Sequence, residues 1–269
     1  MLSYQHIYHA GNAADVQKHA LLAWLLDALV AEGKPLSYLE THSGRGLYAL
    51  NAREAVKTAE AASGVQKLEH VFPEDHPWRR CLQIVREAAG RDAYPGSPVI
   101  AGLLLGTHDR MALAELHPKE HAALDEVMAD FGAEVYREDG FSMATRISPP
   151  APKRGVMVID PSYEVKDDYT RMPGLIAGFA RRWAEGIIVL WYPILTGGAH
   201  LEMLEALTAA HPGALRHEVR FPPAREGHRM EGSGMFILNP PPGLAEEAAR
   251  ITERFAKAQA APVSGRKRR

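Results

Sequence analysis

The sequence predicts an α/β fold: a mostly parallel, doubly wound sheet with an antiparallel hairpin at its edge and a small helical insertion. Three observations favour this fold. Strand-like apolar segments alternate with helical segments from residue 111 onward, the first predicted strand runs into a glycine-bearing turn, and the last two strands have no clear helix between them. At 269 residues the chain has the length of one large domain with an insertion.

The N-terminal half predicts a helix, a strand and the insertion. Apolar residues recur at helical spacing over residues 15–30, and a strand over 36–41 runs into the turn at 42–46. Residues 51–91 are polar and helical with a break at 72–77, so we expect a helical insertion subdomain there. Residues 94–98 are predicted to be a tight loop before a helix that begins near residue 99.

The C-terminal half alternates strands with helices. In order, the pattern predicts a strand at 111–116, a helix at 117–131, a strand at 133–136, a helix from 141, a strand at 155–160, a helix at 169–184, a strand at 187–191, a helix at 201–210 and closing strands at 215–221 and 234–239. The main domain is therefore predicted over 1–50 and 92–260. The basic tail 261–269 is expected to be disordered.

Composition narrows the class of protein. Cys81 is the single cysteine, which rules out an intramolecular disulfide and fits a reducing cytosol. The N-terminus lacks the layout of a secretion signal, and the apolar stretch at 20–30 is too short to span a bilayer, so we expect a cytoplasmic protein that does not enter the membrane. With 31 basic and 33 acidic residues the net charge is −2, so any nucleic-acid contact must come from a local basic patch.

The carboxyl ends of the predicted strands carry an unusual number of polar residues, and ligands bind at that edge of a doubly wound sheet. The turn at 42–46 allows close backbone approach, Glu115 suits the two hydroxyls of a ribose, and Asp139 could accept from an adenine amino group. Each of the three has a plain structural alternative: a tight turn, an exposed acid and an Asp-Gly turn. Together, without a pyrophosphate-binding motif, they indicate an adenosine site of the kind that binds S-adenosylmethionine.

Asp160-Pro161-Ser162-Tyr163 follows the next strand and is the sharpest chemical signal. A carboxylate and a neighbouring carbonyl that accept both hydrogens of an aromatic amine favour a pyramidal nitrogen, whose lone pair can then attack a sulfonium methyl. Asp160 would also receive the proton released afterwards, and Tyr163 offers a ring for base stacking. An Asp-Pro turn without chemistry is the alternative.

A second proline-rich motif and the histidines offer two other patterns. Asn239-Pro240-Pro241-Pro242 also follows a strand, but it has no ring in its fourth place and is interpreted as a chain exit. The thirteen histidines include no H-E-x-x-H spacing, so no metal is predicted.

These residues resemble those of the RlmJ family, the bacterial 23S ribosomal RNA adenine-N6 methyltransferases, over nearly the whole chain. The matching segments are Met1-Leu2-Ser3-Tyr4 with His6, His9-Ala10-Gly11-Asn12, Ala14-Asp15-Val16, Lys18-His19, Thr41-His42, Tyr94-Pro95-Gly96-Ser97-Pro98, Glu115-Leu116-His117-Pro118, Asp139-Gly140-Phe141, Trp191-Tyr192-Pro193 and Ser233-Gly234-Met235. Ser162 departs from the family, which has a second proline at that place.

The resemblance implies a class I, Rossmann-like methyltransferase that uses S-adenosylmethionine and acts on 23S ribosomal RNA, expected as a monomer. By position it implies a cofactor site, a catalytic Asp160 that also touches the cofactor, and contacts to the RNA base. The implied cofactor residues are His19, His42, Ser97, Glu115, Asp139, Gly140 and Asp160, and the implied RNA residues are Tyr4, His6 and Lys18. Tyr163 is expected to contact the RNA base as well, from the stacking argument above. Two alternatives remain: a DNA adenine-N6 methyltransferase, and a non-catalytic protein that binds S-adenosylmethionine or RNA.

Overall fold

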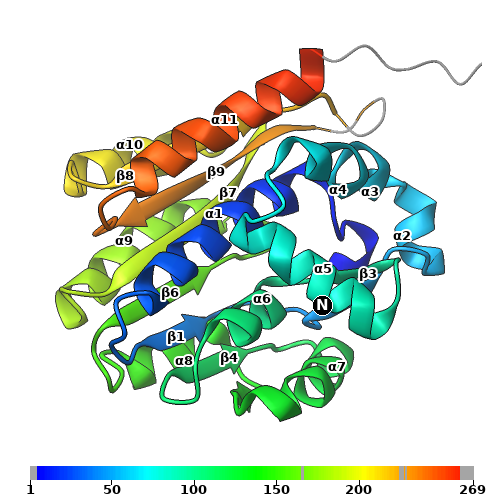
Figure 1. Cartoon of the computed structure of the whole chain (residues 1–269). Helices are drawn as coiled ribbons and strands as arrows, with labels where there is room; N and C mark the ends of the chain where they lie inside the picture. Colours follow the sequence, from blue (N-terminus) through cyan, green and yellow to red (C-terminus); the bar gives the residue numbers. More distant parts are fainter. Residues whose placement is uncertain (1–4, 165–166, 224–226, 228, 261–269) are drawn as a thin grey trace, which may run out of the picture.

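A central sheet organises the protein, as the computed structural model shows over residues 5–164, 167–223, 227 and 229–260 (Figure 1). Within these residues seven strands pair in the order β5-β4-β1-β6-β7-β9-β8. They are β1 (Ser37–Glu40), β4 (Arg110–Ala114), β5 (Glu134–Tyr136), β6 (Gly155–Ile159), β7 (Ile187–Leu195), β8 (Leu215–Arg220) and β9 (Met230–Leu238).

The sheet confirms the predicted doubly wound topology. β1 pairs in parallel with β4 on one side and β6 on the other, β5 continues beyond β4, and β7 continues beyond β6. β9 runs antiparallel to both β7 and β8, which confirms the edge hairpin. Because the chain order reverses at β1, a crevice is expected at the carboxyl ends of β1 and its neighbours.

Helices cover both faces of the sheet and create two apolar cores. Side chains of α8, α9 and α10 form the core on one face, and those of α1, α6, α7 and α11 contribute to the core on the other. The bounds are α1 (Ala13–Val30), α6 (Ser97–Leu104), α7 (Pro118–Met128), α8 (Gly140–Ile147), α9 (Asp167–Arg182), α10 (Leu201–Ala210) and α11 (Leu244–Ala260), with single 3-10 turns η1 (His6–Tyr8) and η3 (Ala129–Phe131).

The segment 51–91 is helical, as predicted, and packs closely on α1. Trp78, Cys81 and Leu82 of its longest helix belong to the same core as Leu22 and Leu26 of α1. The helices are α2 (Arg53–Thr58), α3 (Glu60–Ser63), α4 (Val65–Leu68), η2 (Glu69–Val71) and α5 (Pro77–Ala89). The division into a main domain and an insertion subdomain stays a prediction.

Two differences from the predicted elements occur beside this segment. The two short strands β2 (Leu47–Ala49) and β3 (Ala93–Pro95) pair antiparallel at its base, where no strand was predicted. The predicted tight loop over 94–98 is wrong, since β3 ends at Pro95 and α6 begins at Ser97. These strands are three residues each, too short for an alternating pattern to stand out.

In the part of the chain that the structure describes, no helix is both long and apolar enough to cross a bilayer. The tail 261–269 lies outside the described residues.

Candidate functional site

A cleft of about 650 Å³ opens at the carboxyl ends of the central strands, within the size range of small-molecule sites. Every described residue that the sequence predicted for the site lines it: His6, Lys18, His19, His42, Ser97, Glu115, Asp139, Gly140, Asp160 and Tyr163. Tyr4 lies outside the described residues. The individual roles of these residues stay predictions, but their meeting in one cleft is a structural fact.

The turn after β1 is hydrogen-bonded to Glu115. Gly44 adopts a φ of 62°, and its N–H donates to Glu115 Oε2 over 2.9 Å, while the N–H of His117 donates to Oε1 over 2.7 Å. Burial raises the pKa of Glu115. Each carboxylate oxygen still has a lone pair for a further donor, such as a ribose hydroxyl.

Asp139 is the N-cap residue that precedes α8, beside the end of β1. Its Oδ1 accepts from the N–H of Ser142 over 2.8 Å, which caps the helix. A Cβ on Gly140 would lie 1.8 Å from the carbonyl oxygen of Thr41, so only glycine allows this approach. His42 meets the edge of Phe141 with ring centroids 5.1 Å apart, and burial lowers the pKa of His42 to about 4. His42 is therefore a neutral ring at pH 7, and the guanidinium of Arg171 lies 5.7 Å from the centroid of the Phe141 ring on the same wall.

Asp160 is paired with Lys18. Oδ2 of Asp160, at the end of β6, lies 2.5 Å from Nζ of Lys18 on α1. Nζ also lies 3.5 Å from Oδ1 of Asp15 and 6.0 Å from the centroid of the Trp191 ring. Burial lowers the pKa of Lys18, but the two carboxylates outweigh burial and raise it above its ordinary value. The ammonium is thus a fixed positive charge on the floor of the cleft.

Asp15 organises the N-terminal side of the cleft. Its Oδ2 accepts from the N–H of Gly11 and lies within hydrogen-bond distance of His6 Nε2, both at 2.9 Å, and it is 2% exposed. Burial raises the pKa of Asp15, but His6, His19 and Lys18 together bring it below its usual range. His19 stays neutral, because burial lowers its pKa to about 3. Sequence reasoning assigned no role to Asp15; its place between His6 and Lys18 in the N-terminal block was the available signal.

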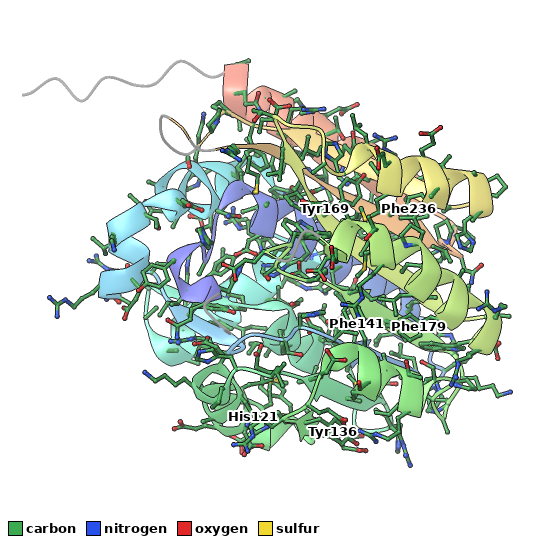
Figure 2. All side chains as sticks on the ribbon, turned by 180° about the vertical axis from the view of Figure 1, so that it is seen from behind. His121, Tyr136, Phe141, Tyr169, Phe179 and Phe236 are labelled. Atoms are coloured by element: carbon green, nitrogen blue, oxygen red, sulfur yellow. The ribbon has the colours of Figure 1, made fainter. Side chains whose placement is uncertain are left out.

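Tyr163 is less open than the sequence suggested. Its backbone has a φ of 54°, and its Oη donates to the carbonyl oxygen of Trp191 over 2.8 Å. The centroids of the Tyr163 and Tyr169 rings are 4.5 Å apart. It is 9% exposed but still lines the cleft. Tyr169 and Phe141 both lie on the face that carries α8 and α9 (Figure 2).

Two further polar groups received no role from the sequence, although Trp191 was expected at this edge of the sheet. The indole Nε1 of Trp191 is buried and finds no hydrogen-bond partner among the described residues, and Trp191 lines the cleft. Glu40, fully buried in β1, accepts from Ser97 Oγ over 2.5 Å and from Tyr38 Oη over 2.9 Å. Burial raises the pKa of Glu40 to about 7. An acid within an apolar strand was the signal for Glu40.

The structure also bears on the second proline-rich motif and on the possibility of a metal site. Nδ2 of Asn239 donates to the carbonyl oxygens of Ala184 and Gly186 over 2.9 and 2.8 Å, outside the cleft, which agrees with a chain exit. Among the described residues no group of three or more histidine, cysteine or acidic side chains is arranged to hold a metal ion.

Comparison with known proteins gives consistent similarities. The family described as Ribosomal RNA large subunit methyltransferase D, RlmJ, matches residues 33–269. Ribosomal RNA large subunit methyltransferase J of Escherichia coli is 36% identical over 252 residues, covering 92% of this chain and 90% of that protein. Its namesake from Haemophilus influenzae is 36% identical over 249 residues, covering 90% and 88%. A crystal structure of a Legionella pneumophila protein matches with a TM-score of 0.83 at 32% identity, covering 93% of this chain and 94% of that one.

Proposed function

The chain belongs to the RlmJ family of large-subunit ribosomal RNA methyltransferases, and from this premise we propose that its cleft methylates N6 of an unpaired or flipped-out adenine in 23S ribosomal RNA. The fold is that of a class I, Rossmann-like methyltransferase, and the methyl donor is S-adenosylmethionine. The observation that carries the proposal is the position of Asp160 in the same cleft as the glycine turn, Glu115 and Asp139.

The residues of the cleft fit this cofactor. S-adenosylmethionine supplies an electrophilic methyl group on a positively charged sulfur. Glu115 would hold the ribose hydroxyls and Asp139 the adenine amino group, with the neutral faces of His42 and Phe141 beside the ring. Acidic side chains suit a cationic sulfonium, and among the described residues neither Glu115 nor Asp139 forms an ion pair with a lysine or arginine; the Lys18 ammonium is paired with Asp15 and Asp160 instead.

Asp160 is the proposed catalytic residue. Its Oδ2 contacts Lys18, which leaves Oδ1 to accept a hydrogen from the target amino group. With the carbonyl of Pro161 accepting the second hydrogen, the nitrogen lone pair is directed away from the ring plane. The new nitrogen–carbon bond forms as the sulfur–carbon bond breaks, and Asp160 then takes the proton that the methylated nitrogen releases.

The N-terminal segment is the proposed base-binding side. His6, Lys18 and Tyr163 line the cleft together with Asp160, and Tyr4 is proposed, from the family resemblance, to contact the RNA. A base inside a helix cannot enter such a cleft, so the target must be unpaired or flipped. We further propose that the protein acts as a cytoplasmic monomer.

Transfer of tritiated methyl from S-adenosylmethionine to unmodified 23S ribosomal RNA, followed by nucleoside analysis, tests this function. N6-methyladenosine should be the labelled product. Double-stranded and single-stranded DNA of matched sequence should take up far less label. Equal labelling of DNA would favour the alternative DNA methyltransferase, and cofactor binding without labelling of either polymer would favour a non-catalytic protein.

A further inference from the structure

A second, smaller cavity of about 120 Å³ lies beside the main cleft and has no part in the chemistry proposed above. Its walls come from segments distant in sequence: the start of α1, the helices α3 and α4 of the insertion, residues 221–223 after β8, the first residue of β9 and the last turns of α11. These elements lie together at the upper side of the molecule in Figure 1. The cavity therefore lies where the insertion meets α1, α11 and the residues that join β8 to β9.

The cavity adjoins the cleft through shared walls. Asn12, Glu60 and Met230 line both spaces. Nδ2 of Asn12 donates to Glu60 Oε2 over 3.2 Å, and Glu60 Oε1 lies 3.0 Å from Nδ1 of His9, so this boundary is fixed by hydrogen bonds. The cavity and the cleft are thus immediate neighbours.

The chemistry of the walls suits a flat, uncharged ring with polar edges. Phe221, Phe255, Pro222 and Pro223 supply apolar surface, and Asn12 and Glu60 supply hydrogen-bonding groups. Glu60 already has partners, but a carboxylate has about four lone-pair sites and can accept further hydrogen bonds from a base edge. Lys67 is exposed and is the one cation among the described residues that line the cavity, and Glu60 offsets its charge, so these walls suit an uncharged base better than a phosphate.

We infer that this cavity receives the base of a nucleotide that flanks the target adenine in the RNA. The inference rests on the proposed function, because it requires an RNA strand in the cleft. Unpaired RNA is recognised by splaying bases apart and stacking them on aromatic side chains. The cavity would hold the strand in register while the adjacent adenine enters the cleft, and would confer sequence preference at that flanking position.

The first test leaves the protein unchanged and alters the RNA. A short RNA that carries the methylated adenine is prepared with each of the two nucleotides on either side replaced in turn by an abasic ribose. One replacement should raise KM for RNA about tenfold, as expected for loss of one stacked base, with kcat little changed. If none of the four raises KM, the inference is wrong. If even the intact RNA takes up no methyl, the proposed function itself fails, so the two failures are distinct.

The second test fills the cavity. Ser63 and Ala62 are both exposed neighbours on α3, but only Ser63 lines the cavity. Ser63→Trp should raise KM for intact RNA about tenfold and cancel the effect of the sensitive abasic replacement, while Ala62→Trp should do neither. The affinity for S-adenosylmethionine and the melting temperature serve as folding controls for both variants. Equal KM values for the two variants would overturn the inference.

Discussion

Nζ of Lys18 lies 2.5 Å from Oδ2 of Asp160, although the two residues are 142 positions apart and come from α1 and the end of β6. The pair joins the N-terminal segment to the proposed catalytic turn. Lys18 is 5% exposed, so this is a buried ion pair, whose loss is costly when only one partner is removed.

We therefore expect Lys18→Met to lower the free energy of unfolding by about 3 kcal/mol, because Asp15 and Asp160 lose their shared counter-ion. Asp160→Asn should lower the free energy of unfolding less in the Lys18→Met background than in the parent protein. Urea unfolding of the parent, both single variants and the double variant measures this coupling. Strictly additive changes would contradict a direct pair.

Asp160→Asn should lower kcat for RNA methylation at least about 100-fold, because the amide cannot take the released proton. The affinity for S-adenosylmethionine should change much less than kcat. Asp125→Asn is the matched control, since Asp125 is exposed on α7 outside the cleft and should leave both values unchanged. Full turnover by Asp160→Asn would remove Asp160 from the mechanism.

Glu115→Ala should weaken binding of S-adenosylmethionine about tenfold or more, because the turn loses the acceptor for the Gly44 and His117 N–H groups as well as the proposed ribose contact. Isothermal titration gives the dissociation constant. Glu126→Ala removes an exposed acid from α7, the helix that follows Glu115 in the chain, and should bind S-adenosylmethionine normally. An unchanged dissociation constant for Glu115→Ala would mean that another group holds the ribose.

Glu40 should make stability fall as the pH rises. Burial raises its pKa from 4.5 to about 7 in the folded protein, so between these values the folded state holds a proton that the unfolded state has lost. The free energy of unfolding should then drop by up to about 1.4 kcal/mol per pH unit from this group, and level off above pH 7. Glu40→Gln removes this slope, whereas the exposed Glu253→Gln keeps it. Urea unfolding between pH 5 and pH 8 that gives parallel curves for parent and Glu40→Gln would refute the assignment.

The sequence predicted the topology well because the alternation of strands and helices is a local pattern. The same order places Glu115, Asp139 and Asp160 at one edge of the sheet, and the structure brings them into one cleft. Strand lengths were less predictable: β9 begins at Met230 rather than at residue 234, since Glu231, Gly232 and Ser233 interrupt the apolar pattern.

The electrostatic pairs could not be predicted from pattern. Lys18 was assigned to the RNA from the family resemblance, and its ion pair with Asp160 depends on α1 lying across the end of β6. Tyr163 was expected to offer an open ring, yet its positive φ turns it onto Tyr169. Such contacts join segments far apart in sequence, so they follow only once the tertiary packing is known.

The shared core of α5 and α1 has a consequence for engineering. Lys18 and Asp15 lie on α1, a helix buried on nearly all sides, and Trp78 and Leu82 belong to the core that surrounds it. Excising residues 51–91 to make a minimal enzyme would uncover that helix and loosen the groups beside Asp160. A chimaera that borrows the insertion from a relative would have to borrow the matching side of α1 with it.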